Sequence, residues 1–171
     1  MTREELLGAL RDVGNALQER GTEARLYVVG GAWMVLTQRS REITMDVDGD
    51  FYPREILLEI SRAVAHDRGL PAHWLNAAAN AFIPVFRSPE WKFFARLGSL
   101  ELWVADQRTM LAMKLRASRG RRDENDIRLL LQLCDVDTLE QAQSLYHEFY
   151  PEDPAPSRAW DIVTFLLAQR S

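Results

Sequence analysis

The uneven distribution of hydrophobic periodicity along the 171-residue chain most constrains its fold. Segments with the short apolar runs or the two-residue alternation of β-strands occur only in the first two-thirds. Helical spacing with glycine stops dominates the rest, and the predicted helix caps are Thr2, in a capping box with Glu5, Thr109, Asp123 and Asp137. The predicted strands cover 26–29, 43–51, 92–95 and 100–105, and the predicted helices cover 2–20, 32–38, 53–68, 72–80, 109–118, 123–133, 137–149 and 157–169. This order predicts an α+β, or mixed α/β, fold with a mixed sheet flanked by helices and a helical C-terminal cover.

Length and composition indicate one structural unit in the cytoplasm. We expect a main domain of residues 1–133 with a helical appendage, 134–171, packed on it. The net charge of −4 excludes a protein that binds its partners through an overall basic surface. The single cysteine, Cys134, favours an intracellular protein. No apolar run approaches 18 residues, so no membrane partner is expected.

Asp46 and Asp48 form the first candidate site, because they flank one apolar residue in a segment with strand periodicity. Residues two apart on a strand point to the same face, so both carboxylates are expected to project together. Such a pair suits Mg²⁺ or Mn²⁺, which take their other ligands from phosphates and water. The alternative is a solvated strand edge, in which Asp50 extends an acidic run.

Gly30 and Gly31 form the second candidate site, at the predicted junction between a strand and a helix. Glycines let the backbone approach a ligand closely, and the N–H groups at a helix start favour a phosphate. A plain tight turn would also explain the pair. The GxGxxG and Walker patterns are missing, so a Rossmann or P-loop site is poorly supported.

Together these features resemble nucleotidyltransferases of the DNA polymerase β type, in which a Gly-Ser or Gly-Gly turn precedes Asp-x-Asp on the next strand. Other stretches are similar to small stand-alone bacterial members, AbiEii-like proteins among them, and the resemblance covers residues 26 to about 133. These stretches are Arg41 to Asp48 with Thr44 two positions before the first Asp, the run Trp74-Leu75-Asn76, and segments 111–117 and 122–127 with Lys114 and Asp126.

The resemblance implies a Mg²⁺- or Mn²⁺-dependent enzyme that transfers NMP from an NTP to a hydroxyl group of an RNA, for example a tRNA, or of a protein. Asp46 and Asp48 would bind the metal, while Gly30 and Gly31 would hold the phosphates. Similar proteins are often encoded beside an antitoxin gene, so an antitoxin protein is an implied partner and a toxin role an implied function. The other implied site residues are Thr44 and Lys114 at the nucleotide, Asp126 near the nucleotide pocket, and Glu101 as a third metal ligand. An ion pair of Asp126 with Arg122 or Arg119 is the alternative.

Lys114 has further support from composition, because 19 of the 21 basic residues are Arg and only Lys92 and Lys114 are Lys. A compact ammonium group reaches a phosphate where a planar guanidinium does not fit. The alternative is a lysine that extends from an apolar helix face to solvent. Residues 114–128 carry a charge of +3, which favours phosphates or RNA, although an exposed helix–helix turn would look the same.

The sequence also departs from the family pattern. The turn lacks the hydroxyl group of the Gly-Ser version. Glu101 alternates with Leu100 and Leu102, but nothing in the sequence shows that it faces the two aspartates. These departures leave a second hypothesis open, in which the chain is a non-catalytic module that binds a nucleotide or a partner through the same fold.

Overall fold

The computed structural model describes residues 1–38, 43–118 and 120–169, and shows a mixed α/β fold as predicted. The chain forms two compact units. Unit 1 comprises Met1–Ala81 and Trp91–Ala105, and unit 2 comprises Phe82–Glu90 and Asp106–Ser171. This division differs from the predicted one, because residues 106–133 group with the C-terminal helices rather than with the sheet.

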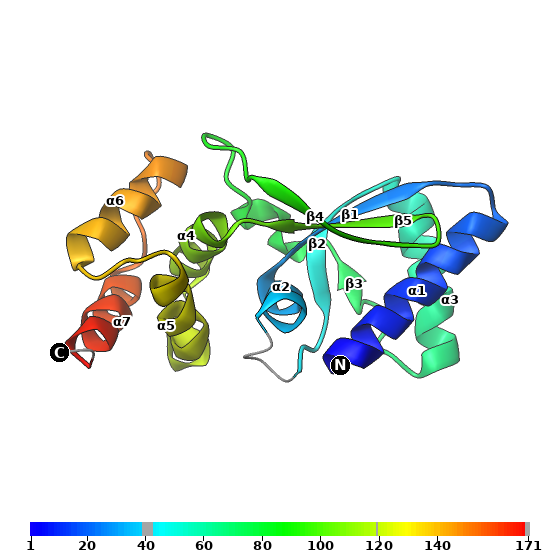
Figure 1. The fold of residues 1–171 in the computed structure, drawn as a ribbon, viewed down its shortest axis with the longest axis horizontal. Coiled ribbons are helices and arrows are strands. Elements are labelled where there is room, and N and C mark those ends of the chain that lie inside the picture. The colour runs from blue at the N-terminus through cyan, green and yellow to red at the C-terminus, as the bar shows by residue number, and fades with distance from the viewer. Residues whose placement is uncertain (39–42, 119, 170–171) are drawn as a thin grey trace. The chain divides into compact units, whose positions relative to one another are not determined.

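Unit 1 contains a five-stranded mixed sheet with the strand order β3-β2-β1-β5-β4 (Figure 1). The central strand β1 runs antiparallel to β2 and parallel to β5. β3 pairs parallel with β2, and β4 pairs antiparallel with β5. The strands are β1 (Ala24–Val29), β2 (Val47–Tyr52), β3 (Leu75–Asn76), β4 (Trp91–Leu97) and β5 (Leu100–Ala105).

The two faces of this sheet differ in burial. One face is the hydrophobic core, where α1 (Arg3–Glu19) and α3 (Arg54–Arg68) pack side by side (Figure 1). Its strand residues include Leu26, Val28, Val47, Phe51, Leu100 and Leu102, all buried. The opposite face, here called the open face, carries the alternate residues Arg25, Tyr27, Asp48, Asp50, Glu101 and Trp103, each partly or fully exposed.

Helix α1 is fixed at its start and along its length. The predicted capping box is present: Thr2 Oγ1 accepts from the Glu5 N–H, and the Glu5 carboxylate accepts from the Thr2 N–H at 2.8 Å. Further along, the carbonyl oxygen of Gly14 accepts a hydrogen bond of 3.1 Å from the N–H of Ser99 in the β4–β5 turn. A side chain at position 14 would prevent this close approach of helix and turn.

Unit 2 is helical. Its elements are α4 (Gln107–Ala117), the 3₁₀ turn η2 (Gly120–Asp123), α5 (Glu124–Leu133), α6 (Leu139–Phe149) and α7 (Ser157–Ala168). α4 packs against α5, α6 and α7. The segment before β4 joins this unit because the hydroxyl group of Tyr150 donates to the carbonyl of Phe82 and Arg87 forms an ion pair with Glu148.

Two predicted elements around the candidate aspartates differ in the structure. The strand predicted over 43–51 begins only at Val47, because Thr44 donates its N–H to the carbonyl of Met1 instead of to a strand. The helix predicted over 72–80 is wrong. Leu75 and Asn76 pair with β2 as β3, and the 3₁₀ helix η1 (Ala78–Phe82) follows.

The predicted caps in unit 2 also need correction. α4 is capped by Asp106 and not by Thr109, since the Asp106 carboxylate accepts from the N–H of Thr109 at 3.0 Å. α6 is capped by Thr138 through a capping box with Gln141. In both helices the sequence offers several adjacent capping residues, and side-chain geometry selects among them.

Candidate functional site

Gly30 and Asp48 lie side by side across the β1–β2 ladder. Val29, the last residue of β1, pairs with Asp48, and α2 (Gly30–Thr37) begins directly afterwards. Gly30 has a φ of 67°, in the left-handed region that favours glycine, and a Cβ there would lie 3.3 Å from Asp48 Oδ2. Glycine at position 30 therefore lets a helix begin in contact with a carboxylate.

The start of α2 has the character of a phosphate site. Its N-cap residue is Val29, whose apolar side chain makes no capping hydrogen bond. The first N–H groups of a helix point along its axis and favour an anion. A metal-bound phosphate group needs N–H donors for the phosphate and a carboxylate for the metal. The start of α2 and Asp48 offer these two parts in contact.

Asp46 and Asp48 flank a buried residue at the start of β2. Val47 between them is fully buried, whereas both aspartates are partly exposed. Asp46 lies just before β2, where its carbonyl accepts a 2.9 Å hydrogen bond from the hydroxyl of Thr44. Thr44 itself is buried, and this hydrogen bond is to backbone and not to a ligand. Arg41, part of the family-like run, lies outside the described residues.

Glu101 is not placed to act as the third metal ligand. It lies on the open face, as its alternation predicted, but its register partner on β1 is Arg25, whereas that of Asp48 is Val29. Four residues along a strand correspond to about 13 Å. Periodicity selected the correct face of the sheet but not the position along the strand, which depends on pairing.

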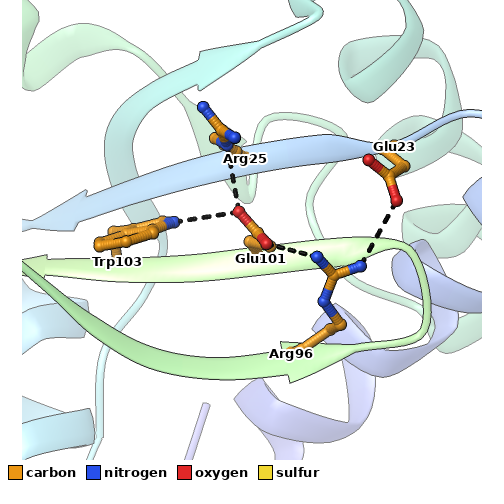
Figure 2. A network of polar contacts seen from close by, with 5 residues as sticks. All are labelled: Glu23, Arg25, Arg96, Glu101 and Trp103. Atoms are coloured by element: carbon orange, nitrogen blue, oxygen red, sulfur yellow. Dashed lines mark hydrogen bonds and ion pairs between the residues drawn. The ribbon is translucent and has the colours of Figure 1, made fainter.

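Glu101 instead joins an ion-pair network, shown in Figure 2. It accepts from Arg25 Nε at 3.1 Å, from Trp103 Nε1 at 3.4 Å and from Arg96, which also reaches Glu23 at 3.5 Å. Burial alone would raise the pKa of Glu101, but the hydrogen bonds from Arg96, Arg25 and Trp103 outweigh it and hold the pKa below its usual value. Glu101 is therefore a carboxylate anion at neutral pH.

Lys114 and Asp126 come together in unit 2. Lys114 Nζ lies 2.7 Å from Asp126 Oδ2 and 3.0 Å from Asp123 Oδ1, and only 5% of Lys114 is exposed. One ammonium thus serves two buried carboxylates. Asp123 was expected to cap α5, but its side chain makes no capping bond and binds Lys114 instead.

This cluster differs from the predicted role of Lys114 as a phosphate ligand. Its ammonium already has two anionic partners, and a phosphate would have to displace a carboxylate to reach it. The cluster and the Asp46–Asp48 pair also belong to different compact units.

Two further basic residues of the 114–128 segment have acidic partners. Arg128 pairs with Glu124 at 3.1 Å, and Arg116 pairs with Asp153 at 2.8 Å while lying 4.6 Å from the centre of the Tyr150 ring. Arg119 lies outside the described residues. These contacts support the interpretation of the segment as a helix–helix turn with ion pairs.

The sequence also contained a feature that our interpretation missed. Tyr27, Trp91, Phe93 and Trp103 lie on the open face, with ring centroids 6.4 Å apart for Tyr27–Trp103, 5.0 Å for Tyr27–Trp91 and 5.4 Å for Phe93–Trp103. The alternation of aromatic residues at 91 and 93 was the available signal. The pairing of three strands was needed to bring the rings together.

No protein-family model matches the chain, and no curated protein or solved structure matches it either. Among the described residues, no group of three histidine, cysteine, aspartate or glutamate side chains is arranged to hold a metal ion. No described helix has the length and apolar character needed to span a membrane. Support for the candidate site therefore comes from its own geometry.

Cys134 is expected to react slowly as a nucleophile. Burial raises the pKa of its thiol to about 11, with Asp106 and Asp135 acting in the same direction and Arg108 opposing them. Because the thiolate is the reactive form, iodoacetamide labelling at pH 8 should be at least about tenfold slower in the folded protein than in urea, and should accelerate about tenfold per pH unit up to pH 10. A labelling rate that levels off below pH 9 would contradict this pKa.

Proposed function

We propose that the chain is a nucleotidyltransferase that moves an NMP group from an NTP to a hydroxyl group of an RNA. The observation that carries the proposal is the contact between the start of α2 and Asp48. A Cβ atom added at Gly30 would lie only 3.3 Å from Asp48 Oδ2. In the reaction the acceptor oxygen bonds to the α-phosphorus, the bond from that phosphorus to the pyrophosphate oxygen breaks, and the hydroxyl proton is released.

Two carboxylates fit a Mg²⁺ or Mn²⁺ ion, because these hard cations take oxygen ligands and complete their shell with phosphates and water. Asp46 and Asp48 would hold it. When bound, the ion supplies charge neutralisation at the phosphates and lowers the pKa of the acceptor hydroxyl.

The chain's own residues orient the reactants. The N–H groups at the start of α2, at Gly30 and Gly31, hold the phosphates, and the absence of a Cβ at Gly30 leaves space between that backbone and Asp48. Thr44 fixes the carbonyl of Asp46 and so the path of the chain into β2. Lys114 and Asp126 stabilise unit 2 in this proposal and take no part in transfer.

One observation favours a second candidate function, a module that binds nucleotide without transferring it. Of the three predicted metal ligands only Asp46 and Asp48 remain, since Glu101 lies elsewhere on the sheet with its own arginine partners. An antitoxin or another partner that supplies a third ligand would convert such a module into an enzyme.

The test is transfer of label from each of the four α-labelled NTPs, with Mg²⁺, to total tRNA or cell RNA. We expect Asp48→Asn to reduce transfer at least about a hundredfold, because it removes a charge that acts in the transition state. The free energy of unfolding should change by less than about 1 kcal/mol, since Asp48 is partly exposed. Equal transfer by wild type and Asp48→Asn would overturn the proposal. Binding of NTP without transfer would favour the module.

A matched pair of glycine variants tests the contact itself. Gly30 and Gly69 have nearly equal φ values, 67° and 65°, but a Cβ at Gly69 has nothing within 4 Å. Both Ala variants should lose about 1–2 kcal/mol of stability from backbone strain. Only Gly30→Ala should also reduce transfer, by about tenfold or more, because its methyl group displaces Asp48 Oδ2. Equal loss of transfer in both variants would mean that the contact has no role.

A further inference from the structure

Helix α2 begins with two glycines and is only eight residues long. A helix of about two turns is marginal by itself, so its orientation is set by contacts with the rest of the fold. Glycine permits many backbone conformations, and Gly30 and Gly31 therefore do not fix the direction in which the helix leaves β1. The proposed phosphate site needs that direction to be fixed, because its donors are the first N–H groups of this helix.

Apolar packing holds α2 in the core of unit 1. Its residues 32–36 are all buried, and the helix packs against β1 and β2. This burial keeps α2 against the sheet, but the hydrophobic effect has no preferred direction. A hydrogen bond between the helix and a strand does have one, and it limits how far the first turn can rotate.

Trp33 makes a hydrogen bond of this kind. Its indole Nε1–H donates to the carbonyl oxygen of Ala105 at 2.6 Å, and only 2% of Trp33 is exposed. Ala105 is the last residue of β5, and Val104 before it pairs with Val28 on β1. The bond therefore joins the end of the first turn of α2 to β5, which flanks β1 on the side opposite to β2.

The first turn of α2 thus has contacts with both strands that flank β1. On one side Gly30 lies against Asp48 of β2, where an added Cβ would be 3.3 Å from Oδ2. On the other side Trp33, three residues later, is bonded to β5. Contacts on opposite sides of β1 restrict rotation of the turn, and so hold the N–H groups of Gly30 and Gly31 in one place relative to the Asp48 carboxylate.

The last turn of α2 also has a polar contact. Arg3, in the first turn of α1, donates from Nε to the carbonyl oxygen of Leu36 at 3.3 Å. A cation at the C-terminal end of a helix interacts favourably with the helix dipole, whose positive end here lies at the proposed phosphate site. Arg3 therefore holds the far end of the helix that Trp33 holds at its start.

We propose that Trp33 is a positioning residue for the phosphate-binding start of α2, with Arg3 in the same role at the opposite end. This inference rests on the proposed function, because it takes the NTP phosphates as the ligand of that helix start. Trp33 is buried and its N–H is already bonded, so it acts through the direction of the backbone N–H groups. An apolar ring of similar size would fill the same space without fixing that direction.

The test compares Trp33→Phe with Trp74→Phe. Trp74 is the matched control, because it is fully buried in unit 1 and its indole N–H donates to the carbonyl of Ser61 in α3 at 2.8 Å. Each variant removes one buried hydrogen bond and keeps an aromatic ring, so both should lower the melting temperature by about 3–10 °C. Binding of inorganic triphosphate with Mg²⁺, measured by isothermal titration calorimetry, should weaken about tenfold in Trp33→Phe alone, because its donors are no longer preorganised.

Arg3→Ala is a milder variant that leaves the core intact. It should weaken triphosphate binding about 2- to 5-fold, as loss of a cation at a helix C-terminus does. Arg11→Ala, which removes an exposed arginine from the same helix α1, should leave binding unchanged.

Kinetics separate positioning from a loss of folded protein. In the transfer assay Trp33→Phe should raise the KM for NTP about tenfold and leave the KM for the acceptor RNA unchanged, because it alters one of the two binding steps. A purely structural defect would lower the amount of active enzyme, and so the apparent kcat, with both KM values kept. Trp74→Phe should show that second pattern.

The inference and the proposed function fail separately. Equal triphosphate affinity in Trp33→Phe and Trp74→Phe, or a wild type that binds no triphosphate, would overturn the inference. Triphosphate binding with the expected variant effects but without transfer of NMP overturns only the transferase. Transfer by the wild type, with equal KM values for NTP in the two tryptophan variants, overturns only the positioning role of Trp33.

Discussion

Gly14→Ala is expected to lower the free energy of unfolding by about 3 kcal/mol, although alanine is the better helix former. Gly14 lies in α1, and a Cβ there would fall 2.7 Å from the carbonyl carbon of Leu97 and closer still to its oxygen. Both atoms are backbone, so no side-chain rotation relieves the clash. The helix and the β4–β5 turn must move apart, which breaks the 3.1 Å hydrogen bond from Ser99 N–H to the Gly14 carbonyl.

Gly8→Ala in the same helix is the matched control. A Cβ at Gly8 meets only the guanidinium end of Arg68, at 3.2 Å, and that flexible side chain can shift. The propensity gain of about 0.5–1 kcal/mol should therefore appear there as unchanged or increased stability. Urea denaturation followed by circular dichroism measures both variants. A Gly14→Ala midpoint equal to that of Gly8→Ala would show that α1 does not approach the turn this closely.

The sequence predicted local features better than their placement in three dimensions. The capping box at Thr2 and the strands predicted at 26–29 and 100–105 depend on neighbours in the chain, and these predictions are confirmed. The brief strand β3 was predicted as a helix because its two residues depend on pairing with Val47 and Asp48. Non-local pairing of this kind leaves little trace in periodicity.

The candidate site shows the same limit. The glycine pair and Asp48 were predicted from a strand–turn–helix pattern, and the antiparallel ladder brings Gly30 against Asp48. Glu101 was expected there too, because its alternation was correct for the open face. Glu101 pairs with Arg25, four residues before Val29 on β1. This register depends on the parallel pairing of β1 with β5, which no local pattern specifies. The cluster of Tyr27, Trp91, Phe93 and Trp103 was missed for that reason.

Lys114→Met should destabilise the protein by about 3–5 kcal/mol, the cost of removing one partner from a buried ion-pair cluster. Without the ammonium, Asp123 and Asp126 would both lose a cation that lies within 3.0 Å of their carboxylates, in a place where only 2% and 7% of these residues are exposed. The shape of the side chain is nearly kept, so packing alone would predict a loss below about 1.5 kcal/mol. The size of the loss therefore separates charge from packing. Lys92→Met on the exposed part of β4 is the control and should change stability by less than about 0.5 kcal/mol.

Lys114→Arg decides between the structural role and a phosphate-binding role. A guanidinium keeps the charge but is larger than the space around a side chain that is 6% exposed, so we expect a loss of about 1–3 kcal/mol. If Lys114 serves only unit 2, NTP with Mg²⁺ should raise the melting temperature of wild type and of Lys114→Arg by the same increment. The increment should disappear only in Asp48→Asn. A normal stability for Lys114→Arg, together with loss of the NTP increment, would instead assign the ammonium to a phosphate and Asp126 to the nucleotide pocket. The composition of the chain fits the structural outcome, because a buried position between two carboxylates favours the compact ammonium where most other basic positions carry arginine.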